Sequence, residues 1–233
     1  MKNSGESEIN RKIQYKAHFS MWAALKSPLL MGHDLRTMSA KTLTILNNPA
    51  IIAISQDPLG LAVNLVRRDT NVKKDKYGMG ETHLWTGQLA NGDQVVILFN
   101  AADQDIQMSA SLEEIFYYEG PEGSAPQVNQ VWDVYDLWAG RMDIETAQRI
   151  LDADDDLPAR EQLLKETHWY NSSAMSYQEG LKAGDARLLG KKSSSIAPGV
   201  ALSVLVKRHS AEVLRLRNPG EKIARYSIAK DEL

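Results

Sequence analysis

Residues 84–99, LWTGQLANGDQVVILF, decide the fold class of this chain. Two apolar runs, residues 84–86 and 95–99, flank the dipeptide Asn91-Gly92. Asn-Gly is favoured in a two-residue hairpin turn, because both turn positions there require a positive φ. The stretch therefore predicts a β-hairpin and, with it, an antiparallel sheet.

Alternation of apolar and polar residues predicts further strands beyond the hairpin. Residues 106–110 alternate as a half-buried strand does, and residues 200–206 do the same. Residues 213–216, VLRL, are expected to close the sheet. Residues 61–217 are therefore expected to form an antiparallel β-sandwich, which makes the chain mainly β.

A helical insertion is expected within the sandwich, near residues 141–166. Apolar residues recur there at helical spacing, at Ile144, Ala147, Ile150 and Leu151. The acidic run 152–156 that follows is expected to be a solvated loop, because it lacks the glycine turn and spaced ligands of a calcium site.

The first sixty residues show a different pattern, of helix and buried strand. An apolar stripe at Tyr15, Phe19 and Trp22 predicts a helix, which Pro28 is expected to end. Residues 29–32, LLMG, are wholly apolar, which is typical of a strand buried on both faces.

A second helix is expected to begin at Ser39 as its cap and to end at residues 47–49, NNP. Helix, buried strand and helix in succession are typical of an α/β fold. Residues 1–60 are therefore expected to form a short α/β segment ahead of the sandwich.

Composition and charge exclude several classes of partner. The 233 residues carry a formal net charge of −3, which gives no reason to expect a nucleic-acid partner. No apolar run approaches the about 20 residues of a membrane-spanning helix. The absence of cysteine excludes disulfides and cysteine-ligated zinc. No other metal and no organic cofactor is expected.

The two ends of the chain disagree about a location in the secretory pathway. Residues 218–233 are expected to be a tail, and it ends in the retrieval signal KDEL at Lys230, Asp231, Glu232 and Leu233. Residues 1–16 are polar and contain no signal-peptide core. If an upstream signal peptide exists, we expect the protein to reside in the lumen of the endoplasmic reticulum and to bind a KDEL receptor. We then also expect glycosylation at the sequon of Asn171. Without a signal peptide, the location stays open.

Five motifs occur in the order found in a known enzyme family. They are residues 17–36, AHFSMWAALKSPLLMGHDLR; 51–60, IIAISQDPLG; 132–138, WDVYDLW; 184–192, GDARLLGKK; and 208–213, RHSAEV. Over residues 14–217 they resemble the C-terminal portion of fungal-type alpha-galactosidases, or melibiases, of glycoside hydrolase family 27.

The resemblance implies a (β/α)8 barrel followed by an antiparallel sandwich, with this chain beginning just before the last barrel strand. It implies retaining hydrolysis of terminal α-D-galactosyl residues by two aspartates. The segments that carry those aspartates have no counterpart here, so the chain is expected to be inactive by itself. Whether the sugar is galactose, N-acetylgalactosamine or arabinopyranose stays open.

Few local residues are candidates for the chemistry. Asp34 is either a carboxylate at the barrel mouth, and then a candidate catalytic residue, or a cap and ion-pair partner of Arg36. His33 either contacts substrate at the barrel mouth or is structural. Asp57 is expected to be a turn or cap residue. The tryptophans at 132 and 138 are expected to pack in the core rather than to stack on sugar.

Two alternatives to a truncated glycosidase remain. One is a non-catalytic carbohydrate-binding or interaction sandwich of the endoplasmic reticulum, and the other is a fragment that complements a separately encoded barrel. Because the barrel neighbours of residues 29–31 are missing, residues 1–60 are expected to pack poorly and to be proteolysed faster than residues 61–217.

Overall fold

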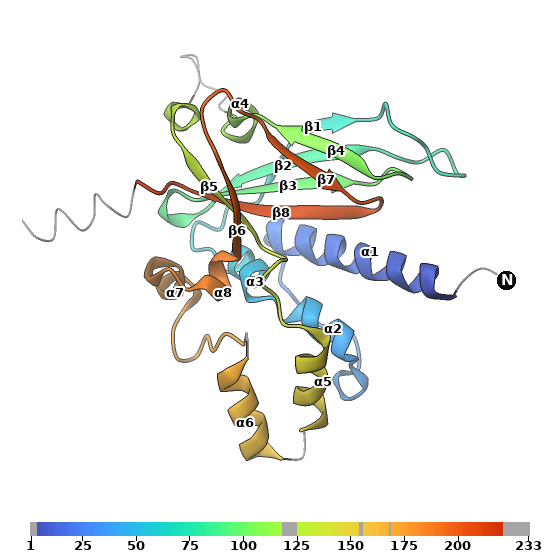
Figure 1. Cartoon of the computed structure of the whole chain (residues 1–233), viewed down its shortest axis with the longest axis vertical. Coiled ribbons are helices and arrows are strands. Elements are labelled where there is room, and N and C mark those ends of the chain that lie inside the picture. The colour runs from blue at the N-terminus through green and yellow to red at the C-terminus, as the bar shows by residue number, and fades with distance from the viewer. Residues whose placement is uncertain (1–3, 118–124, 154–155, 168, 221–233) are drawn as a thin grey trace, which may run out of the picture.

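The computed structural model describes residues 4–117, 125–153, 156–167 and 169–220. Within them, an antiparallel sheet has the strand order β1-β2-β3-β8-β5-β6, and β4 pairs with β7 in a second sheet (Figure 1). The strands are β1 (Asn64–Asp69), β2 (Thr82–Gln88), β3 (Gln94–Asn100), β4 (Ile106–Ala110), β5 (Trp132–Asp136), β6 (Lys191–Ile196), β7 (Leu202–Val206) and β8 (Ser210–Arg217). The expected antiparallel sandwich is thereby confirmed.

The hairpin predicted from residues 84–99 is formed by β2 and β3. Its strands pair up to Gln88 and Gln94, so the connection is longer than the expected two-residue turn. Asn91 and Gly92 nevertheless adopt the positive φ values, 64° and 76°, for which Asn-Gly is suited. They belong to a short 3-10 turn, η2 (Ala90–Gly92), that lengthens the loop.

The alternation that predicted β4 and β7 is confirmed, because both strands bury every second residue toward the larger sheet. The expected place of residues 213–216 is wrong. Their strand, β8, lies in the interior of the sheet between β3 and β5. Val213 and Leu214 point to opposite faces and are both buried, which is the pattern of a central strand.

Helices from the first sixty residues cover the face of the sheet opposite β4 and β7. Figure 1 shows α1 (Ser4–Ala24) running beneath β8, and α3 (Pro49–Ser55) packs beside it. Phe19 and Ile51 share one apolar core with Ile97 and Val213. The expectation that these first residues pack poorly is therefore wrong for α1 and α3, since the sheet supplies the apolar surface that buries them.

The first helix differs from the sequence expectation in where it ends and in which residues of its apolar stripe are buried. It ends at Ala24, well before Pro28, and a left-handed residue at Lys26 (φ 59°) turns the chain away. Tyr15 is exposed whereas Phe19 is buried, so only part of the apolar stripe faces the core.

The strand expected at residues 29–32 is not formed. Leu30 and Met31 are 74% and 58% exposed, and a 3-10 turn, η1 (Leu35–Thr37), follows. A strand buried on both faces requires hydrogen-bonded neighbours at its edges. None of the described residues pairs with this segment, so the run LLMG remains an exposed loop.

The second expected helix is confirmed as α2 (Ala40–Leu46), with Ser39 accepting a hydrogen bond from Thr42 N as its cap. A further helix that was not predicted, α3, begins at Pro49 with Asn48 as its cap. Proline suits the first turn of a helix because that N–H has no intrahelical partner.

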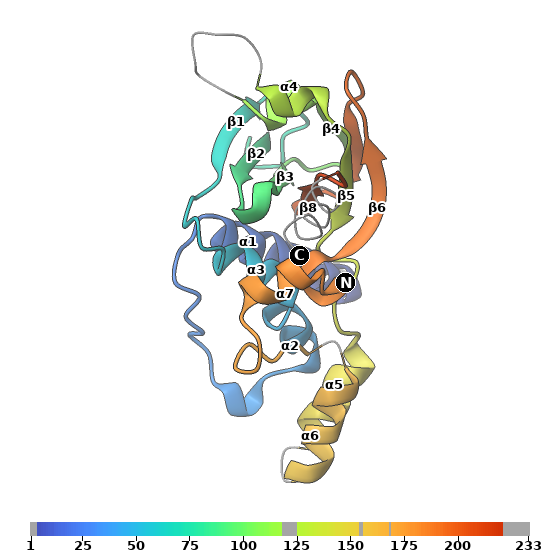
Figure 2. The ribbon, with the colours of Figure 1, turned by 90° about the vertical axis from the view of Figure 1, so that its left-hand side faces the viewer.

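The helical insertion is confirmed as α5 (Ile144–Asp152) and α6 (Leu157–Glu166). These helices project away from the sheet, and α5 packs on α2 (Figure 2). The other short helices are α4 (Leu112–Ile115), α7 (Tyr177–Ala183), α8 (Ala186–Leu189) and η3 (Pro126–Asn129). No helix in the described ranges is both long and apolar enough to cross a membrane.

Candidate functional site

The loop between α1 and α2 carries the two residues that the sequence analysis singled out, His33 and Asp34. The Asp34 carboxylate accepts hydrogen bonds from the main-chain N of Arg36 at 3.0 Å and from its Nη2 at 2.8 Å. These hydrogen bonds hold the pKa of Asp34 below its ordinary value. Asp34 therefore stays charged and paired, as a cap of η1, while His33 is exposed beside it.

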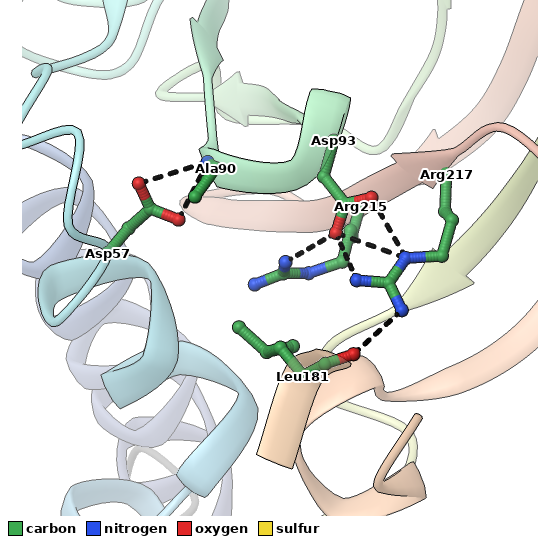
Figure 3. Close-up of polar contacts among 6 residues, drawn as sticks. All are labelled: Asp57, Ala90, Asp93, Leu181, Arg215 and Arg217. Atoms are coloured by element: carbon green, nitrogen blue, oxygen red, sulfur yellow. Dashed lines mark hydrogen bonds and ion pairs between the residues drawn. The ribbon is translucent and has the colours of Figure 1, made fainter. Parts of the chain in front are cut away.

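Asp57 has a larger structural role than a local turn. Its buried carboxylate accepts a hydrogen bond from Leu59 N at 3.1 Å, as a turn residue does. It also accepts one from Ala90 N, 2.9 Å from Oδ2 (Figure 3). Asp57 thus ties the end of α3 to the loop of the β2–β3 hairpin.

A second buried carboxylate in that hairpin loop neutralises two arginines of β8. Asp93 Oδ2 lies 2.8 Å from Arg215 Nη1 and 2.6 Å from Arg217 Nη2 (Figure 3). Arg217 Nη1 also donates to the main-chain O of Leu181, at the end of α7. Burial lowers the pKa of Arg215, and the charge of Asp93 opposes that shift. This network was not predicted from the sequence, although two arginines alternating with leucines in an apolar strand were a visible signal.

An open pocket of about 610 Å³ gathers ionisable side chains where α1 meets β8 and the connection between β5 and α5. Lys16 Nζ lies 4.8 Å from the centre of the Trp138 ring, and Arg141 Cζ lies 5.6 Å from it, as in cation–π contacts. Burial raises the pKa of Glu212 and lowers the pKa of Lys16, while each charge partly offsets the shift of the other. Perturbed groups of this kind occur in active sites and also in structural ion-pair networks.

The tryptophans of the WDVYDLW motif pack in the core, as predicted. Trp132 and Trp138 are 2% and 4% exposed. Their indole N–H groups donate to Gln127 O and to Ser20 Oγ, both at 3.0 Å. These rings are therefore not available as a sugar-stacking surface.

The remaining sequence candidates lie at the surface or outside the described residues. Asn171 is exposed, and its Oδ1 accepts a hydrogen bond from Ser173 N at 3.1 Å, within the expected sequon. Asp152 ends α5 and Asp156 caps α6, whereas residues 154–155 of the acidic run and the KDEL signal lie outside the described residues. In the part of the chain that is described, no group of three or more histidine or carboxylate side chains is arranged to hold a metal.

Comparison with known proteins identifies both halves of this architecture. A model of the alpha galactosidase C-terminal beta sandwich domain matches residues 79–159, and a model of alpha galactosidase A matches residues 5–57. The alpha-galactosidase of Saccharomyces paradoxus is 40% identical over 205 residues, which cover 87% of this chain. The chain is related to the C-terminal part of family 27 alpha-galactosidases.

Solved alpha-galactosidase structures agree with this assignment. The enzyme of Saccharomyces cerevisiae has a TM-score of 0.79 and 37% identity, over 89% of this chain and 44% of that one. A family 27 β-L-arabinopyranosidase of Geobacillus stearothermophilus, at 16% identity and a TM-score of 0.54, shares the fold alone. The chain spans 41% of the length of the Saccharomyces paradoxus alpha-galactosidase.

Proposed function

We propose that this chain forms the C-terminal part of a retaining alpha-galactosidase that hydrolyses terminal α-D-galactosyl residues. The observation that carries the proposal is the TM-score of 0.79 with the alpha-galactosidase of Saccharomyces cerevisiae. A second solved structure of that enzyme contains raffinose, a trisaccharide that ends in an α-galactosyl residue. The substrate class proposed here is therefore an α-galactoside.

We also propose that the chain does not hydrolyse α-galactosides by itself. Retaining hydrolysis needs two carboxyl groups roughly 5–5.5 Å apart, one free to attack and one able to donate a proton. Asp34 is bound to Arg36, Asp57 accepts main-chain N–H groups, and Asp93 neutralises two arginines. These contacts favour structural roles for all three carboxylates and leave the catalytic pair to other barrel segments.

The exposed loop between α1 and α2 is the surface that we propose to meet those barrel segments. Leu30 and Met31 lie exposed there, a few residues after α1, and α1 packs against the sheet through Phe19. The proposed role of the sandwich is to hold α1 and this loop in place. Positioning of that kind matters because small displacements of catalytic groups cost large factors in rate.

Hydrolysis of p-nitrophenyl α-D-galactopyranoside tests the proposal. The chain would be assayed alone, and also when produced together with the upstream sequence of its own gene. Activity only in the longer form is expected. Activity in the chain alone would contradict the second proposal, and Asp34→Asn in that chain would then show whether Asp34 contributes. Inactivity of a folded longer form would contradict the first proposal.

A location in the endoplasmic reticulum is proposed from the KDEL motif, and it is compatible both with a glycosidase and with the alternative of a non-catalytic carbohydrate-binding sandwich. The accessible Asn171 would then be glycosylated. Expression behind a signal peptide tests both points. Digestion with an endoglycosidase should lower the apparent mass of the chain but not of Asn171→Gln, and removal of residues 230–233 should release the chain into the medium. An unchanged mass and continued retention would refute the two proposals.

A further inference from the structure

A polar pocket of about 850 Å³ opens at one end of the sandwich, beside the segment that follows β4. Four carboxamide side chains line it, those of Asn64, Gln88, Gln94 and Gln127. None of the described residues that line the pocket is charged. Its volume lies within the range of small-molecule sites, about 300–1,000 Å³.

The strand register directs three of the amides into the same space. Asn64 of β1 pairs with Thr86 of β2, and Gln88 of β2 pairs with Gln94 of β3. Directly paired residues share a face of a sheet, and so do residues two apart, such as Thr86 and Gln88. Three amides and one hydroxyl therefore project together from adjacent strands, on the face that buries Val96 inside the sandwich.

The fourth amide is that of Gln127, whose main chain is held by a hydrogen bond while one side-chain acceptor is unpaired among the described residues. The main-chain O of Gln127 accepts a hydrogen bond from the buried Trp132 indole at 3.0 Å. The side-chain Oε1 of Gln127 is buried and has no hydrogen-bond partner within the described part of the chain. Buried polar atoms are normally paired, so Gln127, whose side chain lines the pocket, brings an unsatisfied acceptor into the pocket wall.

Two further contacts fix the geometry of the pocket. Gln94 Nε2 donates to Ile115 O at 3.0 Å, which joins the sheet to α4. Phe116 packs on Trp132 with ring centres 4.6 Å apart, and the next residue, Tyr117, is 63% exposed. The pocket thus combines a buried, hydrogen-bonded amide at Gln94 with an exposed aromatic ring at its edge.

We propose that this pocket binds a neutral sugar residue. Carboxamides both donate and accept hydrogen bonds, as sugar hydroxyls do, so the two sets match without any charge. An ionic ligand would lose hydration and find no counter-charge among the described lining residues. The Tyr117 ring offers an apolar surface to the C–H face of a sugar. The inference is independent of the proposed hydrolysis, because binding here requires no carboxylate pair.

Binding to the full chain tests the proposal. Methyl α-D-galactopyranoside at millimolar concentration would be titrated against isotopically labelled protein, and the side-chain amide resonances of Gln88 and Gln94 would be followed. These resonances should shift in a saturable way, and D-galacturonate, which is charged, should shift them far less. A folded protein whose amide resonances do not respond to the galactoside, or respond equally to galacturonate, would overturn the proposal.

A pair of matched variants localises the site. Gln127→Met removes one of the four lining carboxamides at nearly constant volume, and it should weaken binding about fivefold, the effect of one lost hydrogen bond. Gln107→Met is the control, because Gln107 is an exposed residue of β4 bonded to Ser203 and does not line the pocket. Thermal unfolding would confirm that both variants fold. Unchanged affinity in Gln127→Met, or an equal loss in Gln107→Met, would refute the assignment.

Discussion

The Asp93 carboxylate lies 2.8 Å from Nη1 of Arg215, an arginine whose side chain is completely buried. The Nε and Nη2 atoms of Arg215 have no hydrogen-bond partner among the described residues. Asp93 is therefore the group that neutralises this buried charge, and it also binds Arg217 at 2.6 Å. The contact joins the β2–β3 loop to the central strand β8.

Removing the charge of Asp93 should destabilise the fold strongly. Asp93→Asn leaves the Arg215 guanidinium buried without a counter-ion, and breaking a buried pair in this way costs about 3–5 kcal/mol. The measurement is urea unfolding at neutral pH. Asp105→Asn is the control, because Asp105 pairs with Lys207 at the surface and its loss should have little effect. Equal midpoints for the two variants would show that the buried pair does not support the fold.

The amide donor of Asn48 should be required for stability even when its cap of α3 is kept. Its Oδ1 caps α3 by accepting from Ala50 N, while its Nδ2 donates to Leu137 O at 2.9 Å. Asn48→Asp keeps the cap but places a carboxylate against that buried carbonyl, so a loss of about 1–3 kcal/mol or more is expected. Ser39→Asp, at the exposed cap of α2, should be nearly neutral. Thermal unfolding measures both, and similar costs would contradict the assigned role of Nδ2.

Limited proteolysis should begin in the loop between α1 and α2. Arg36 is highly exposed in this loop, whereas α1 and α3 on either side share the core of the sheet. Trypsin is expected to cleave after Arg36 first, and the two fragments should stay associated through that core. Mass spectrometry of the early products and gel filtration measure this. Arg36→Gln should slow the first cut, and an early cut within α1, after Lys16, would contradict the shared core.

The stability of the chain should depend on pH through Glu212. Burial raises its pKa above the ordinary 4.5, so its contribution to stability is complete below 4.5 and is lost as the pH rises through the raised value. Glu212→Gln should therefore gain stability relative to the natural chain as the pH rises through this window. Nearby Lys16 and Asp136 remain in both proteins, so the comparison isolates Glu212.

The control for this pH dependence is Glu179→Gln. Hydrogen bonds from Ser176 lower the pKa of Glu179 below 4.5, so its contribution is present above 4.5 and is lost as the pH falls through the lowered value. As the pH rises from the lowered pKa toward 4.5, the natural chain gains this contribution and Glu179→Gln does not. The variant should therefore become less stable than the natural chain over that range. Denaturant titrations at several pH values measure both differences, and slopes of the same sign would be inconsistent with the opposite shifts.

Local patterns in the sequence determined much of the secondary structure. Asn91-Gly92 and its flanking apolar runs predicted the hairpin, and alternation predicted β4 and β7. Ser39 marked the start of α2, and the WDVYDLW motif together with residues 51–60 indicated the family. These features depend on side-chain period, turn preference and capping, which act between residues close together in the chain.

Tertiary structure alone decided which surfaces meet. It placed β8 inside the sheet, left Leu30 and Met31 exposed, and brought Asp93 to Arg215 across 122 positions of the chain. It also aligned the amides of β1, β2 and β3 around one pocket. The physical reason is that an apolar run or a charge has several stable environments. Only packing with distant segments determines whether it is buried, paired or open to a ligand.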